Sequence, residues 1–294
     1  MDAGSLILFG VALFAATVNG ALGYGFSSLT VPIALLVFPN KILSPALVLV
    51  ELAINTCVVV LNRGSLAMAR RRAMPIIVGL VPGIVIGSYL LSSANPGLLK
   101  LWTYLVILPM ILSQAAGYRR PIRAERVAGA SLGLGVGVLY ATTTISGPPL
   151  ALMLNNQGVD KREFRATLGT VRIVESVTTA IAYGLLGLFS SQSVHLVVPI
   201  APAVLLGLPL GTYLIRRVPN EAFRRVCMSF DAWIVGFGLS HTLIELRLLS
   251  PLDAYSVWGG VILFDLYLLY LYFIVGSVHP RTETVTSLRA EANS

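Results

Sequence analysis

The chain contains one module twice, and the basic loops that flank it are exchanged between the two copies. Five residues recur 124 positions later: Pro75, Gly83, Gly87, Tyr89 and Leu90 return as Pro199, Gly207, Gly211, Tyr213 and Leu214. Arginines precede the module in the first copy and follow it in the second, namely Arg63, Arg70, Arg71 and Arg72, then Arg216, Arg217, Arg224 and Arg225. Because basic loops of membrane proteins stay cytoplasmic, this exchange predicts two copies of opposite orientation.

The composition places the chain in a membrane. Hydrophobic residues make up 56% and charged residues 12% of the sequence, and the mean hydropathy is +0.82, whereas soluble domains carry roughly 25% charged residues. The net charge of +8 comes from Lys and Arg in short loops between apolar runs, which indicates topology bias and argues against a nucleic-acid partner. We expect a multi-pass protein of the cell inner membrane with the lipid bilayer as its surroundings.

The apolar runs divide the chain into eight paired segments and one unpaired segment. The expected segments are 5–38, 42–61, 73–91 and 97–115, then 127–155, 164–189, 194–215 and 221–244, and finally 254–275. The predicted organisation is a first repeat (1–116), a basic cytoplasmic linker (117–126), a second repeat (127–247), an extra helix (254–276) and a polar tail (277–294). The fold class is an all-α polytopic membrane protein with two inverted repeats, each a broken or re-entrant segment plus three transmembrane helices, with one extra C-terminal helix.

Two segments must enter and leave the bilayer on the same side if the loop charges are to agree. The segment 127–155 is flanked by basic residues at both ends, and a helix that crosses once cannot do this. Half-helices that meet near the midplane can, and residues 142–149 (Thr-Thr-Thr-Ile-Ser-Gly-Pro-Pro) supply a break. Residues 19–25 (Asn-Gly-Ala-Leu-Gly-Tyr-Gly) supply the matching break in the first repeat.

The two breaks are the predicted substrate site. Ser146 suits a helix N-cap and Pro148 suits a first helical turn, so the second half-helix would present its positive end to an anion. Gly25 followed by Ser27 offers the same arrangement in the first copy. The alternative is that Gly and Pro only mark kinks. The predicted binding residues are Asn19, Gly23, Tyr24, Gly25, Ser27, Thr143, Thr144, Ser146, Gly147, Pro148 and Arg172.

Ionisable residues within the apolar segments are costly and usually functional. The predicted coupling or charge residues are Glu51, Asn55, Glu175 and Asp231. Arg172 would balance an anionic substrate, or pair with Glu51 or Glu175, and either glutamate would carry a coupling proton. The alternative is an Arg172–Glu175 ion pair that only fixes packing. Gly83 with Gly87, and Gly207 with Gly211, predict close helix packing.

Enzyme motifs are mostly missing from the sequence. Thr144-Ile145-Ser146-Gly147 ends like the Gly-x-Ser-Gly of an intramembrane serine protease, but Thr replaces the first Gly. Cys57 and Cys227 fall within apolar segments and are interpreted as core residues, without metal-ligand spacing. No phosphate-binding loop is present. We therefore expect no enzyme activity, no cofactor and no metal.

Two stretches resemble the signatures of the TauE/SafE family of membrane transporters. The first runs from Gly20-Ala-Leu-Gly-Tyr-Gly25 to Val31-Pro32, and the second comprises Ile145–Leu150 and Asn156–Thr167. The resemblance spans about Leu6 to Ile244 and implies export of sulfite and organosulfonates, or uptake of related anions. The family usually has a glycine triplet at the first signature, where this chain has Phe26 and Ser27 after Gly25.

The predicted function is secondary transport of a small oxyanion such as sulfite or an organosulfonate, in the direction of export. An anion channel on the same scaffold and a non-transporting accessory protein are the alternatives. The expected partner is the small anionic substrate; a coupling proton or sodium ion, and a homodimer, stay open.

Overall fold

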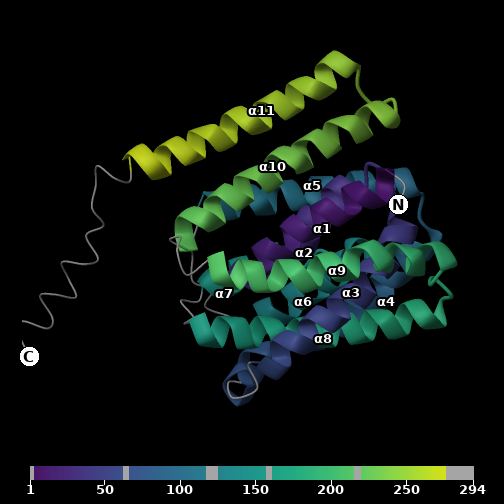
Figure 1. The fold of residues 1–294 in the computed structure, drawn as a ribbon, viewed down its shortest axis with the longest axis vertical. Helices are drawn as coiled ribbons and strands as arrows, with labels where there is room; N and C mark the ends of the chain where they lie inside the picture. The colour runs from purple at the N-terminus through teal and green to yellow at the C-terminus, as the bar shows by residue number, and fades with distance from the viewer. Residues whose placement is uncertain (1–2, 62–65, 117–124, 157–160, 215–219, 276–294) are drawn as a thin grey trace, which may run out of the picture.

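The structure is a computed structural model that describes residues 3–61, 66–116, 125–156, 161–214 and 220–275 (Figure 1). Over these residues the chain forms eleven α-helices and one π-helical turn and contains no strand. The helices are α1 (Ala3–Leu22), α2 (Phe26–Ala34), α3 (Asn40–Leu61), α4 (Leu66–Ser93), α5 (Pro96–Ala115), α6 (Glu125–Thr143), α7 (Gly147–Asn156), α8 (Lys161–Leu185), α9 (Ser191–Leu214), α10 (Asn220–Glu245) and α11 (Pro251–Tyr270), with the π-helical turn at Leu271–Val275. The all-helical class is thus confirmed.

Both segments that were predicted to be broken are broken, but each interruption is shorter than expected. The first helix continues through Asn19 to Leu22, so only residues 23–25 interrupt it, and only residues 144–146 interrupt the second. The predicted linker overlaps α6, which begins at Glu125, and residues 117–124 and the tail 276–294 lie outside the described residues.

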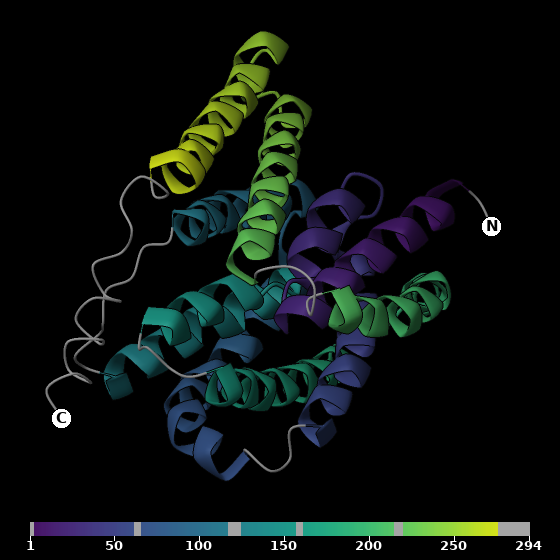
Figure 2. The ribbon, with the colours of Figure 1, turned by 60° about the vertical axis from the view of Figure 1, so that its left-hand side comes forward.

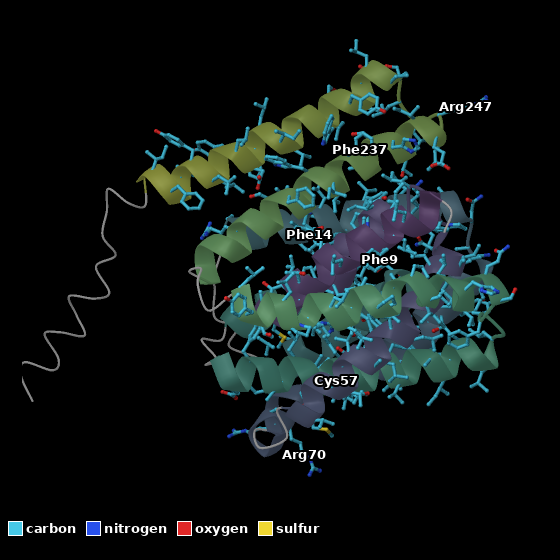
Figure 3. The ribbon with its side chains drawn as sticks, viewed as in Figure 1. Phe9, Phe14, Cys57, Arg70, Phe237 and Arg247 are labelled. Atoms are coloured by element: carbon cyan, nitrogen blue, oxygen red, sulfur yellow. The ribbon has the colours of Figure 1, made fainter. Side chains whose placement is uncertain are left out.

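The basic residues that were assigned to loops lie largely in helices. Arg70, Arg71 and Arg72 belong to the first turns of α4, and Lys161 begins α8. Helices continue past their apolar stretches because Ala, Met, Leu, Lys and Arg are strong helix formers. Arg70 is exposed near the start of α4, at one edge of the bundle (Figure 3). Cys57, expected in the core, is exposed on α3.

Three of the described helices are long and apolar enough to cross a membrane: Ala69–Ser93, Ser191–Leu214 and Pro251–Tyr270. Shorter apolar helices cover Leu6–Ala21, Gly97–Ser113 and Val127–Thr143. The helices α10 and α11 form a pair at one side of the bundle (Figure 2), and α10 connects that pair to α5. Large apolar side chains are exposed along α4, α9 and α11, as expected for surfaces that face lipid.

Glycines bring two pairs of helices into backbone contact. A methyl group on Gly133 of α6 would lie 2.0 Å from the carbonyl oxygen of Ile76 on α4. A methyl group on Gly211 of α9 would lie 1.9 Å from the carbonyl oxygen of Thr17 on α1. The close packing predicted for Gly83, Gly87, Gly207 and Gly211 is confirmed, because each would place a methyl within 3.0 Å of the facing helix.

The helix α7 returns to the end of the bundle from which α6 starts. Glu163 near the start of α8 lies 2.6 Å from Arg72 in α4, and Gly129 of α6 packs on Pro75 of α4, so α4, α6 and α8 begin at the same end. Ser146 contacts Glu175, about 21 Å along α8 from its start at 1.5 Å per residue. If α7 continued away from that start, the four residues 157–160 would have to span about 36 Å, twice their reach of about 18 Å.

Candidate functional site

The two interruptions begin with the same backbone turn. Gly23 and Thr144 each follow the last residue of a helix and have positive φ angles of 84° and 60°. The N–H of Gly23 donates to Asn19 O at 2.7 Å, and the N–H of Thr144 donates to Tyr140 O at 2.6 Å. A β-branched residue rarely adopts this conformation, so Thr144 is held there by its surroundings. The two breaks therefore begin in the same way, 121 residues apart, and differ at their third residue, where Gly25 has a positive φ of 107° and Ser146 does not.

The start of α7 touches the first interruption. A methyl group on Gly147 would lie 3.4 Å from Cδ2 of Tyr24 and 3.7 Å from the amide nitrogen of Gly25. The ring of Tyr24 packs edge-on against Phe164 of α8. Both Tyr24 and Gly25, which were predicted to bind substrate, are buried.

A serine at each half-helix start donates a hydrogen bond to a buried glutamate. Ser27 Oγ at the start of α2 donates to Glu51 Oε1 on α3 at 2.5 Å. Ser146 Oγ, which immediately precedes α7, donates to Glu175 Oε2 on α8 at 2.6 Å. Both glutamates have no exposed surface. Carboxylates thus contact both ends at which a substrate anion was predicted.

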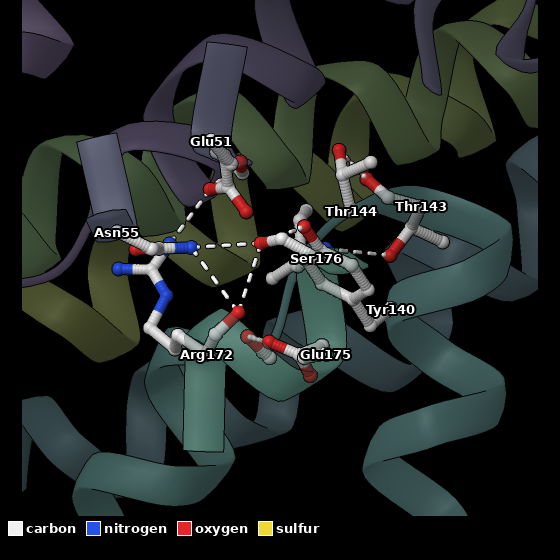
Figure 4. Close-up of polar contacts among 11 residues, drawn as sticks. Glu51, Asn55, Tyr140, Thr143, Thr144, Arg172, Glu175 and Ser176 are labelled. Atoms are coloured by element: carbon white, nitrogen blue, oxygen red, sulfur yellow. Dashed lines mark hydrogen bonds and ion pairs between the residues drawn. The ribbon is translucent and has the colours of Figure 1, made fainter. Parts of the chain in front are cut away.

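Arg172 pairs with Glu51 across two helices. Its Nη2 lies 2.6 Å from Glu51 Oε1, and the side chains are 4% and 0% exposed (Figure 4). The alternative, an ion pair of Arg172 with Glu175, is wrong, because among the described residues Arg172 pairs with Glu51. Although Glu175 lies only three residues from Arg172 on the same helix, its carboxylate points to Ser146.

Two polar side chains that the sequence did not point to, Tyr140 and Ser176, complete a buried cluster with Glu51, Asn55 and Arg172. Asn55 Nδ2 donates to Ser176 Oγ at 2.8 Å and to Arg172 O at 3.3 Å, and the hydroxyl of Tyr140 lies 3.1 Å from Ser176 Oγ (Figure 4). Ser176 follows Glu175 directly, and Tyr140 lies one helical turn before Thr144. Their proximity to a predicted site residue was the only signal available for them.

The threonines of the second break satisfy backbone groups. Thr143 Oγ1 donates to Leu139 O at 2.7 Å and accepts from the N–H of Ile145 at 3.2 Å. Thr144 Oγ1 donates to Thr143 O at 2.6 Å. Both threonine hydroxyls thus support the backbone of the break, and their role in substrate binding stays a prediction.

Other predicted residues lie in different settings. Asn19 is buried in α1, and its Oδ1 has no hydrogen-bond partner among the described residues. Asp231 is fully buried on α10; neither carboxylate oxygen has a hydrogen-bond partner within the described part of the chain. Asp231 makes no described hydrogen bond or ion pair with Glu51, Arg172 or Glu175. Across the described residues, no group of three or more His, Cys, Asp or Glu is arranged to hold a metal ion.

An apolar crevice reaches the second break from the side. It has a volume of about 570 Å³ and lies between α4, α5 and α6, with Thr142 and Thr143 in its wall. Trp102 and Leu98, which are exposed on α5, form part of its outer rim. Glu51, Arg172 and Glu175 do not line it. The charged cluster is therefore separate from this crevice.

Comparison with known proteins identifies the family. No curated protein and no solved structure matches the chain. A family model described as sulfite exporter TauE/SafE matches residues 8–236, which include both interruptions, the cluster and most of α10. This match covers well over half of the 294 residues and confirms the resemblance seen in the two signatures. It supports membrane transport of an anion of the sulfite type. The chain belongs to the sulfite exporter TauE/SafE family of membrane transporters.

Proposed function

We propose that the protein is a secondary transporter that exports a small oxyanion, such as sulfite or an organosulfonate, across the inner membrane. The observation that carries the proposal is the position of Arg172. Its buried guanidinium lies in one hydrogen-bonded cluster with Glu51 and with Ser27 at the start of a half-helix. A buried cation beside a helix N-terminus is an arrangement that stabilises an anion.

The start of α2 supplies further donors for such an anion. The N–H groups of Phe26, Ser27 and Ser28 belong to the first turn, where no carbonyl of the same helix can accept from them. The first amide with a partner there is Leu29, which donates to Gly25 O at 3.2 Å. With the Ser27 hydroxyl and Arg172, these groups would bind the oxygens of sulfite or a sulfonate.

Matched contacts between the halves of the chain support the inverted-repeat hypothesis. Helix α4 of the first half packs on α6 of the second half, and α9 of the second half packs on α1 of the first half, with glycines at corresponding positions of α4 and α9. The equivalent backbone at Gly23 and Thr144 adds independent support. Two such repeats would rock against each other and expose the cluster first to one side of the membrane and then to the other.

Anion binding and flux test the proposal directly. The purified protein would be screened for thermal stabilisation by sulfite, sulfate, methanesulfonate and small carboxylates, since a ligand that binds only the folded state raises its stability. Reconstituted protein would then be assayed for flux of the best ligand. Saturable flux with counterflow supports a carrier, and a linear conductance supports the channel alternative. The absence of stabilisation and flux for every anion would overturn the proposal and favour an accessory role.

A further inference from the structure

The starts of the two half-helices differ in the donors that they offer. At α2 the first three residues are Phe26, Ser27 and Ser28, and each has an N–H group. At α7 they are Gly147, Pro148 and Pro149, and the two prolines have none. Although the dipoles of both helices point their positive ends inward, only α2 presents a full set of amides. The stronger site for an anion is therefore at α2.

A carboxylate of the protein already contacts two donors beside that site. Glu51 Oε1 accepts from Ser27 Oγ at 2.5 Å and from Arg172 Nη2 at 2.6 Å. These are the same donors that a substrate oxyanion would use. Glu51 Oε2 and Arg172 Nε, both buried, have no hydrogen-bond partner among the described residues. The cluster thus retains unused donor and acceptor capacity at its centre.

The charges of the cluster leave no room for a second anion. Among the described residues, the titratable groups close to Glu51 are Tyr140 on α6 and Arg172 and Glu175 on α8. Arg172 balances one negative charge, which is that of Glu51 in this structure. A bound monoanion beside an ionised Glu51 would add a negative charge to a fully buried cluster in which Arg172 is the one cation among the described residues, which is strongly unfavourable. Glu175, held by the Ser146 hydroxyl, provides no compensating positive charge.

We propose that Glu51 is a resident anion that the substrate displaces, and that one proton from water binds the Glu51 carboxylate for each monoanion bound. The neutral carboxyl releases Arg172 and Ser27, which then bind the substrate oxygens. This inference rests on the proposed function and names the coupling ion as a proton. The Arg172–Glu51 pair is then the empty form of the site, and the net charge of the cluster is the same in both forms.

Calorimetry with a non-titrating anion tests this inference. Methanesulfonate stays a monoanion at every pH used, so any proton taken up on binding reports the protein. The binding enthalpy would be measured in two buffers of different ionisation enthalpy, and the difference between the two values should correspond to one proton taken up per bound anion. The Kd should rise about tenfold per pH unit where Glu51 is ionised in the free protein.

Variants at position 51 assign the proton to this residue. Glu51→Gln mimics the neutral carboxyl, so it should bind methanesulfonate without proton uptake and without the pH dependence. Glu51→Asp keeps the carboxylate and should retain both. An infrared band of a protonated carboxyl should appear on binding in the wild-type protein and shift in Glu51→Asp, which assigns the site even if Glu51→Gln does not fold.

The outcomes separate this inference from the proposed function. Binding of methanesulfonate without proton uptake overturns the inference and leaves the transporter proposal standing. Proton uptake that persists in Glu51→Gln overturns the assignment to Glu51. If methanesulfonate and sulfate both fail to bind, and sulfite also fails, the proposed function itself is overturned.

Discussion

Arg172 on α8 and Glu51 on α3 lie 2.6 Å apart, and the pair connects helices from the two halves of the chain. Both side chains are buried, so water cannot take the place of either partner if the other is removed. Removal of one partner leaves the other as an uncompensated charge, and this coupling determines how substitutions at the site will behave.

Arg172→Ala should abolish anion flux and also destabilise the protein by about 3–5 kcal/mol, because the Glu51 charge is left buried and unpaired. The double variant Arg172→Ala with Glu51→Gln should recover most of the stability and none of the flux. Thermal unfolding in detergent and proteoliposome flux measure the two effects. Full transport by Arg172→Ala would contradict the role of this residue in anion binding.

Ser146→Ala should lower the free energy of unfolding by about 1.5–3 kcal/mol, because Glu175 loses its hydroxyl donor in a fully buried position. Ser93→Ala is the matched control, since Ser93 Oγ is exposed and donates only to Tyr89 O in its own helix. The control should change stability by less than about 0.5 kcal/mol. Equal effects of the two substitutions would show that the Ser146–Glu175 contact is energetically unimportant.

Gly133→Ala should prevent the native packing of α6 on α4, because the added methyl would lie 2.0 Å from the backbone oxygen of Ile76. Gly135→Ala, two residues along the same helix, meets nothing within 4 Å and should stabilise the protein by up to about 1 kcal/mol through helix propensity. Yield of folded protein and melting temperature compare the variants. A native-like Gly133→Ala would disprove the backbone contact.

Single cysteines should report opposite membrane faces at Lys41 and Asp160. Lys41 Nζ donates to Ser92 O at the last turn of α4, far from the Arg72 end, whereas position 160 immediately precedes α8, which starts at the Arg72 end. The background would carry Cys57→Ser and Cys227→Ser, since Cys57 is an exposed thiol. Labelling by a membrane-impermeant reagent in whole cells gives the side. The same side for both positions would contradict the re-entrant path of residues 127–155.

Much of the secondary structure was predictable because its signals are local. Apolar runs gave the helices, and the Gly-rich stretch near Gly23 and the Ser-Gly-Pro-Pro stretch after Thr144 gave the two interruptions to within a few residues. The ends of α4 were misplaced because Arg70 to Arg72 were assigned to a loop, although arginine is a strong helix former. Sequence charge indicates the side of the membrane better than it indicates the end of a helix.

The sequence by itself determined a helical membrane protein of the TauE/SafE family with two interrupted helices and a few buried charges, since hydrophobicity, glycine and proline act over a few residues. Only the tertiary structure decided that Arg172 pairs with Glu51, 121 residues away, while Glu175, three residues away, bonds to Ser146. The reason is that side chains on one helix point where the neighbouring helices allow. That direction is fixed by the packing of α3 against α8, and a short stretch of sequence does not reveal which helices will pack together.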